Sequence, residues 1–110
     1  MTEPTKKQIK KFWEWCGFSQ NNTYGTGEFY NYPNGGSALL PELDLNNIFK
    51  WAVPKLGDIE IEKRGNLYEC WIYENRCIAT ISGFAEGDDP ALALFWAIYE
   101  LIEVKDARTE

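Results

Sequence analysis

The chain contains no histidine, the side chain used most often as a general base and as a metal ligand near neutral pH. Its three cysteines, Cys16, Cys70 and Cys77, lack the Cys-x-x-Cys spacing of a zinc site. The glycines at 25 and 27 and at 35 and 36 lack the spacing of a phosphate-binding loop. The sequence therefore predicts no catalytic residue, no metal and no cofactor, and a protein that is not an enzyme.

Long hydrophobic runs are missing as well. No apolar stretch approaches the roughly 18 residues that a membrane span needs, and Glu100 and Glu103 interrupt the longest one. Residues 1–4 do not form the apolar stretch of a signal peptide. We therefore expect a cytoplasmic protein with no membrane partner, whose cysteines are reduced and buried.

Positive charge is scarce beyond the first 16 residues. The formal net charge is −6, yet residues 1–16 carry four lysines against two glutamates, and residues 17–110 carry seven basic and fifteen acidic groups. The lysines are Lys6, Lys7, Lys10 and Lys11. The acidic remainder argues against duplex binding, which requires several phosphate-neutralising cations. We interpret the lysines as the solvated face of a helix, with a nucleic-acid patch as the alternative.

Three helices are predicted from their start signals. Thr5 and Gln8 form a capping box that opens a helix over 5–16. Asp44 is suited to cap a second helix, which ends or kinks at Pro54. An Asp-Pro pair opens a third helix over 90–104, after which residues 105–110 are expected to fray.

Between the helices, the pattern predicts strands. Glycine, asparagine and tyrosine dominate residues 18–41, which read as a short hairpin with a turn at 32–35. Alternation over 58–63, 67–73 and 77–84, with short turns between, predicts an antiparallel meander. In the first of these strands the isoleucines point inward and the glutamates outward. The expectation is one α+β domain over 1–110, in the order α-ββ-α-β-β-β-α, sandwich-like, with helices on both faces of the sheet.

Five aromatic residues are candidate binding residues. Tyr24, Tyr30 and Tyr32 lie in the glycine-rich segment, where they either cover the edge of the core or form a stacking surface for bases or sugars. Trp96 and Tyr99 belong to a second apolar stripe on the closing helix. That stripe needs a cover, which is either another helix or a second copy of the chain in a homodimer.

One acidic cluster precedes the closing helix, and it has two interpretations. Glu86, Asp88 and Asp89 either hold a divalent cation or cap the helix that follows. Pro90 directly after Asp89 favours the cap, because proline is common at the first helical position.

Four segments of the chain resemble parts of small phage and prophage proteins of unknown function. They are residues 41–56 and 89–98 and, more briefly, 12–18 and 32–35. The chain is also similar to the phage α/β/α-sandwich domain group, whose closing helix likewise begins near an Asp-Pro. The resemblance implies a bacteriophage origin and the cytoplasm of a host bacterium. It implies no activity and no site residue.

These observations predict an accessory phage protein that acts by binding an unknown protein of the phage or the host. The acidic body, including Glu60, Glu62 and Glu69, suits a partner that normally holds nucleic acid, because complementary charge speeds and orients encounter. One alternative is a single-stranded nucleic-acid binder that uses the N-terminal lysines and loop aromatics. Another is an enzyme with a divalent metal on the acidic cluster.

Overall fold

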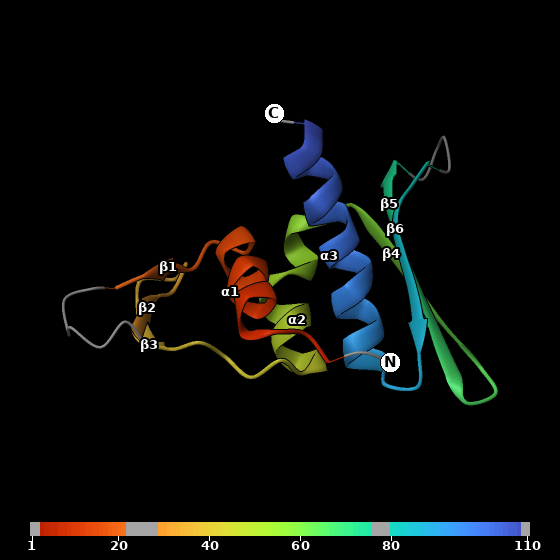
Figure 1. The fold of residues 1–110 in the computed structure, drawn as a ribbon, viewed down its shortest axis with the longest axis horizontal. Coiled ribbons are helices and arrows are strands. Elements are labelled where there is room, and N and C mark those ends of the chain that lie inside the picture. Colours follow the sequence, from red (N-terminus) through yellow and green to blue (C-terminus); the bar gives the residue numbers. More distant parts are fainter. Residues whose placement is uncertain (1–2, 22–28, 76–79, 109–110) are drawn as a thin grey trace. The chain divides into compact units, whose positions relative to one another are not determined.

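The computed structural model describes residues 3–21, 29–75 and 80–108, and the chain divides into two compact units. The N-terminal unit is Pro4–Glu42, and the C-terminal unit is Leu43–Glu110 with the first three residues. Over the described residues there are three α-helices, a short 3-10 helix and two antiparallel three-stranded sheets (Figure 1). The predicted α+β class is confirmed.

Helix α1 (Lys6–Trp15) opens the N-terminal unit with the capping box that the sequence predicts. The Thr5 hydroxyl accepts a hydrogen bond from the amide of Gln8 at 3.1 Å, and the Gln8 side chain accepts one from the amide of Thr5 at 2.8 Å. Two amides at the helix start are thereby satisfied, which fixes where α1 begins.

Gly17 ends α1 in a left-handed conformation, with a φ of 109°. The amide of Gly17 donates to the carbonyl of Glu14 at 3.0 Å, and that of Phe18 to the carbonyl of Trp13 at 3.1 Å. These two bonds form the Schellman arrangement, which satisfies carbonyls that a helix end leaves free. The turn brings the Phe18 ring edge-on to the Trp13 ring, with centroids 5.4 Å apart.

Strands β1 (Ser19–Gln20), β2 (Phe29–Asn31) and β3 (Ser37–Leu39) form the first sheet, in that order. The predicted hairpin is β2–β3, and its turn at 32–35 is confirmed, with Gly35 at a φ of 101°. Strand β1 is an addition to the prediction, because a two-residue strand is too short to show a periodic pattern.

In the C-terminal unit, helix α2 (Leu45–Trp51) begins at the predicted cap. The Asp44 carboxylate accepts from the amide of Asn47 at 2.8 Å. The α-helix ends before Pro54, which lies in a 3-10 turn, η1 (Val53–Lys55). Proline has no amide hydrogen to continue the helix ladder, as the sequence predicted.

Strands β4 (Asp58–Arg64), β5 (Leu67–Asn75) and β6 (Thr80–Gly87) form the predicted antiparallel meander, with β5 central. The last strand was predicted over 77–84, of which 77–79 lie outside the described residues. The strand does not end at residue 84 as predicted but runs on to Gly87. The reason is pairing, since Gly87 lies opposite Tyr68 and the ladder continues to the start of β5.

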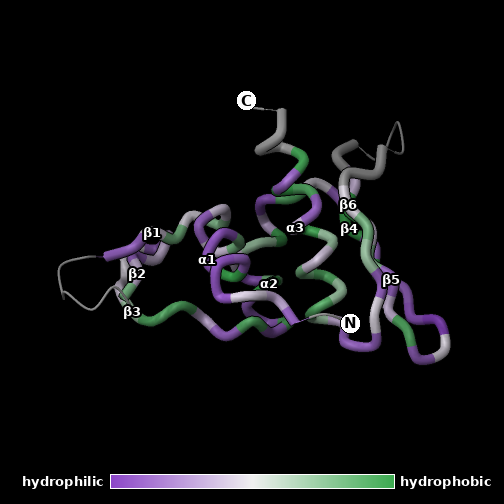
Figure 2. Tube along the Cα trace, in the orientation of Figure 1, coloured by the Kyte–Doolittle hydropathy of each residue, from purple (hydrophilic) through white to green (hydrophobic). Residues whose placement is uncertain are grey.

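Helix α3 (Pro90–Arg108) is longer than predicted, because the segment expected to fray stays helical through Arg108. Lysine, alanine and arginine in that segment are good helix formers, so the backbone continues although the apolar pattern stops. Most of the length of α3 consists of hydrophobic residues (Figure 2). Over the described residues, no helix combines the length and apolar character that crossing a bilayer requires.

Helix α3 packs on one face of the β4–β5–β6 sheet and also contacts α2 (Figure 1). Gly83 of β6 lies against the backbone of α3, so that an added Cβ there would lie 2.1 Å from the carbonyl oxygen of Ala97. The Glu100 carboxylate accepts from the amide of Phe84 at 3.1 Å, which explains an acidic residue inside an apolar helix.

The expectation of helices on both faces of the sheet is wrong for the C-terminal unit. No described element of this unit lies on the face turned away from α3 (Figure 1). The isoleucines of β4 do point to the covered face, opposite Cys70 and Ile72, although Ile61 remains 36% exposed. One helix is too narrow to bury a whole sheet face. Helix α3 packs mainly on β5 and β6, so Ile61 on β4 stays accessible.

Cys16 and Cys70 are free and buried, as predicted, while Cys77 lies outside the described residues. Burial raises the pKa of the Cys70 thiol to about 11, because an apolar environment disfavours the thiolate. The unfolded chain therefore loses this proton at lower pH than the folded chain does. The Cys70 contribution to stability is complete below pH 9 and is lost as the pH rises through 11.

We expect the free energy of unfolding to fall more steeply between pH 9 and pH 11 in the native chain than in a Cys70→Ala variant. The variant starts from a lower stability, because its core loses a sulfur atom. Urea unfolding followed by circular dichroism at each pH measures both slopes. Parallel curves would show that the folded state does not hold the proton on this thiol.

Candidate functional site

Acidic residues from all three strands lie on the face of the C-terminal sheet turned away from α3. Strand register places Glu62, Glu69 and Glu86 directly beside one another in one row across the sheet. We call this surface the acidic face. Its residues are Asp58, Glu60, Glu62, Arg64, Leu67, Glu69, Trp71, Tyr73, Phe84 and Glu86. Like charges directly opposite each other destabilise a sheet, so this row opposes folding.

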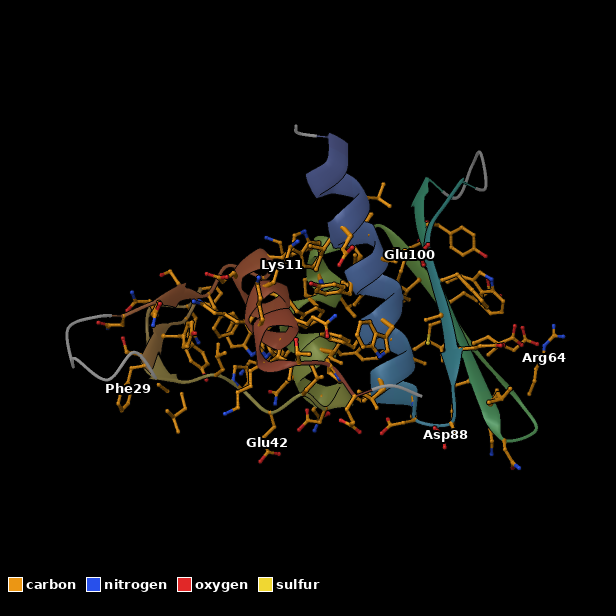
Figure 3. The ribbon with its side chains drawn as sticks, viewed as in Figure 1. Lys11, Phe29, Glu42, Arg64, Asp88 and Glu100 are labelled. Carbon is orange, nitrogen blue, oxygen red and sulfur yellow. The ribbon has the colours of Figure 1, made fainter. Side chains whose placement is uncertain are left out.

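One guanidinium reduces the repulsion within the row. Arg64 Nε lies 3.2 Å from an oxygen of Glu62 and 3.1 Å from an oxygen of Glu69. The hydrogen bond to Glu62 and the two negative charges raise the pKa of Arg64 above its usual value. Figure 3 shows Arg64 extending from the sheet on the side opposite α3. Among the described residues, no cation lies within ion-pair distance of Glu86, the third member of the row.

A second row, next to the glutamates, places an acidic residue beside two aromatic rings. Glu60, Trp71 and Phe84 lie side by side across the sheet. The Trp71 and Phe84 rings are 5.4 Å apart between centroids, and Phe84 remains 38% exposed. The Tyr73 hydroxyl donates to the Glu60 carboxylate at 3.1 Å, which orients that acid beside the rings. Leu67 adds a further exposed apolar side chain.

The two predicted tyrosines that the structure describes in the N-terminal unit, Tyr30 and Tyr32, do not form an open stacking surface with each other. Tyr30 is only 7% exposed. The Tyr32 ring packs edge-on against Phe18, its hydroxyl donates to the carbonyl of Leu39, and burial raises its pKa. Tyr24 lies outside the described residues. The described tyrosines thus serve the packing of their own unit, which leaves base stacking without support here.

The aromatic candidates on α3 lie together. The Trp96 and Tyr99 rings are edge-on with centroids 5.8 Å apart, and Phe95 contacts both. Tyr99 is 7% exposed and Trp96 is half-buried. Since α2 contacts α3, another helix supplies at least part of the cover that this helix requires, and a homodimer through it stays a prediction.

The acidic cluster before α3 contains the predicted helix cap. The Asp89 carboxylate accepts from the amides of Ala91 at 2.9 Å and Leu92 at 3.4 Å. In the described part of the chain, no three acidic, cysteine or histidine side chains are placed to hold a metal ion. Asp88 is exposed, and Glu86 belongs to the acidic face instead.

Sequence reasoning identified some of these acids but not the surface that they form. Alternation placed the β4 glutamates outward, yet it did not reveal that Trp71 and Phe84 join them. The signal was present in β5, where Glu69, Trp71 and Tyr73 share one side. Only the register with β6 and the position of α3 show that no described element of the C-terminal unit covers this side.

Comparison of the chain with protein-family models, with curated proteins and with solved structures finds no match.

Proposed function

We propose that this chain is an accessory protein, encoded by a phage or prophage, that acts by binding a protein with a basic surface. The acidic face carries the proposal. It combines five carboxylates and one guanidinium with the exposed Phe84 ring and the half-buried Trp71 ring on the sheet face turned away from α3. The phage origin and the bacterial cytoplasm rest on the sequence resemblance described above.

The chemistry of the acidic face selects a partner rich in arginine and lysine. A guanidinium binds carboxylates through paired, charge-assisted hydrogen bonds, and it also stacks on aromatic rings. The face offers both within one row, at Glu60, Trp71 and Phe84. Arg64, held between Glu62 and Glu69, shows that these carboxylates accommodate a guanidinium.

The partner that fits best is a protein that normally holds nucleic acid. Such proteins contact phosphates mainly with arginine and lysine, so their binding surfaces are basic. Carboxylates arranged on a rigid sheet would compete with the phosphates for that surface. The same charges repel nucleic acid itself, since both are anionic.

The test compares two triple variants that remove the same charge from different places. One changes Glu60, Glu62 and Glu69 to glutamine, within the acidic face. The control changes Glu3, Glu14 and Glu103 to glutamine, at exposed positions outside it. Each tagged protein captures partners from a bacterial host lysate, with quantification by mass spectrometry. Calorimetry with the purified partner then gives the affinity.

We expect a partner whose affinity falls at least about tenfold in the acidic-face variant and remains unchanged in the control. A single-stranded oligonucleotide should displace this chain from the partner. Equal weakening by both triple variants would reduce the effect to net charge and contradict the proposal. Retained binding by the acidic-face variant would also contradict it, provided that circular dichroism shows the native fold.

A further inference from the structure

The N-terminal unit contains a groove of about 600 Å³ between the first half of α1 and the β2–β3 hairpin. Three lysines of α1 line one part of it: Lys6, Lys7 and Lys10. Ile9, Tyr30 and the consecutive leucines 39–40 form the rest of the lining, which is apolar. Its volume lies within the range of roughly 300–1,000 Å³ that small-molecule sites occupy.

The lysines stand where helix electrostatics disfavours them. Lys6 and Lys7 occupy the first two positions of α1, and the first turn contains no acidic residue. The amide dipoles make a helix start positive, so cations there cost up to about 1 kcal/mol each. Among the described residues, no carboxylate lies within ion-pair distance of Lys6, Lys7 or Lys10. Positive charge therefore accumulates at this end, with no ion-pair partner in the described part of the chain.

The apolar lining includes aliphatic side chains that water reaches. Leu39 is 57% exposed, which is more than any other large hydrophobic residue among those described. Ile9 and Leu40 are half-buried, and Tyr30 is nearly covered. Because Tyr30 is buried and Ile9 and the leucines have no ring, the groove suits an aliphatic chain better than a stacked base.

We propose that this groove binds a small amphiphilic anion, namely an aliphatic chain that ends in a carboxylate. The carboxylate would lie among the three lysines, where the start of α1 adds its own positive potential. The aliphatic chain would cover Ile9, Leu39 and Leu40, removing their exposed surface from water. This site uses the opposite charge from the acidic face and does not depend on the proposed partner.

The test uses dodecanoate, measured below its micelle concentration by calorimetry and by amide chemical shifts. We expect saturable binding, with shifts concentrated in residues 6–10 and 38–40. Butanoate, which keeps the charge but lacks the chain, should bind at least about tenfold more weakly. Dodecyltrimethylammonium, which keeps the chain but reverses the charge, should not produce these shifts.

Two variants distinguish a loss of ligand binding from a loss of the fold. Changing Lys6, Lys7 and Lys10 to glutamine should weaken dodecanoate binding at least about tenfold without loss of stability, because the helix start loses unfavourable cations. Leu39→Ser, at an exposed position, should weaken it as well. The matched triple change of Lys50, Lys55 and Lys63, exposed lysines of the other unit, should leave it unchanged.

Three results would overturn the proposal. One is the absence of saturable dodecanoate binding to the native chain. Another is equal weakening by both lysine triple variants, which would mean attraction to net charge alone. The third is tighter binding of an acidic peptide or a twelve-nucleotide thymidine strand at the same residues, which would assign the groove to a macromolecule. Partner capture by the acidic face is measured in a separate experiment. A failure of one proposal therefore leaves the other standing.

Discussion

Replacing Gly83 with alanine is expected to destabilise the C-terminal unit by about 3 kcal/mol, the upper end of what overpacking a core usually costs. An added Cβ would lie 2.1 Å from the carbonyl oxygen of Ala97 and 3.1 Å from its carbonyl carbon. Both atoms belong to the backbone of α3, so no flexible side chain can move aside. The helix would have to shift away from the sheet, which loosens the packing of Leu94 and Ile98.

Urea unfolding followed by far-ultraviolet circular dichroism measures this loss, and amide hydrogen exchange locates it. The control is Gly36→Ala, where the nearest atom to the added Cβ is a side-chain oxygen of Asn34 at 3.8 Å. That change should alter stability by less than about 0.5 kcal/mol. A Gly83→Ala protein as stable as the control would mean that α3 does not approach β6 as closely as the structure shows.

Local chemistry explains which parts of the fold the sequence predicted. Thr5, Asp44 and Asp89 each cap the helix for which they were predicted, because a side-chain oxygen beside free amides acts within one turn. The turn at 32–35 is equally local. Strand β1 and the last turn of α3 were missed or misjudged, because their sequence lacks the periodicity on which such predictions depend.

The candidate surfaces depend on pairings between distant segments, which a single sequence does not show. Glu62, Glu69 and Glu86 become neighbours only through the register of three strands. Tyr30 was a candidate for stacking, yet it is buried at the groove that Lys6 lines. The sequence thus predicted which residues are charged or aromatic, while the topology determines which of them share a surface.

Trp13→Ala is expected to cost about 4 kcal/mol of stability, because it leaves a large cavity in a closely packed site. The Trp13 side chain is fully buried, with the Phe12 ring at 4.9 Å and the Phe18 ring at 5.4 Å between centroids. Since Phe18 also contacts Tyr32, the loss would reach the hairpin that follows. Urea unfolding followed by circular dichroism measures the change in the free energy of unfolding.

Trp13→Phe is the variant to compare with Trp13→Ala, because it keeps an aromatic ring while removing the one polar atom of the side chain. The indole Nε1 of Trp13 is buried and has no hydrogen-bond acceptor among the described residues. Burying such a donor costs roughly 1–3 kcal/mol, and its removal offsets much of the volume lost on going to phenylalanine. We therefore expect Trp13→Phe to retain native stability within about 1 kcal/mol. If it were as damaging as Trp13→Ala, ring size alone would dominate this site, and the buried N–H would carry no penalty.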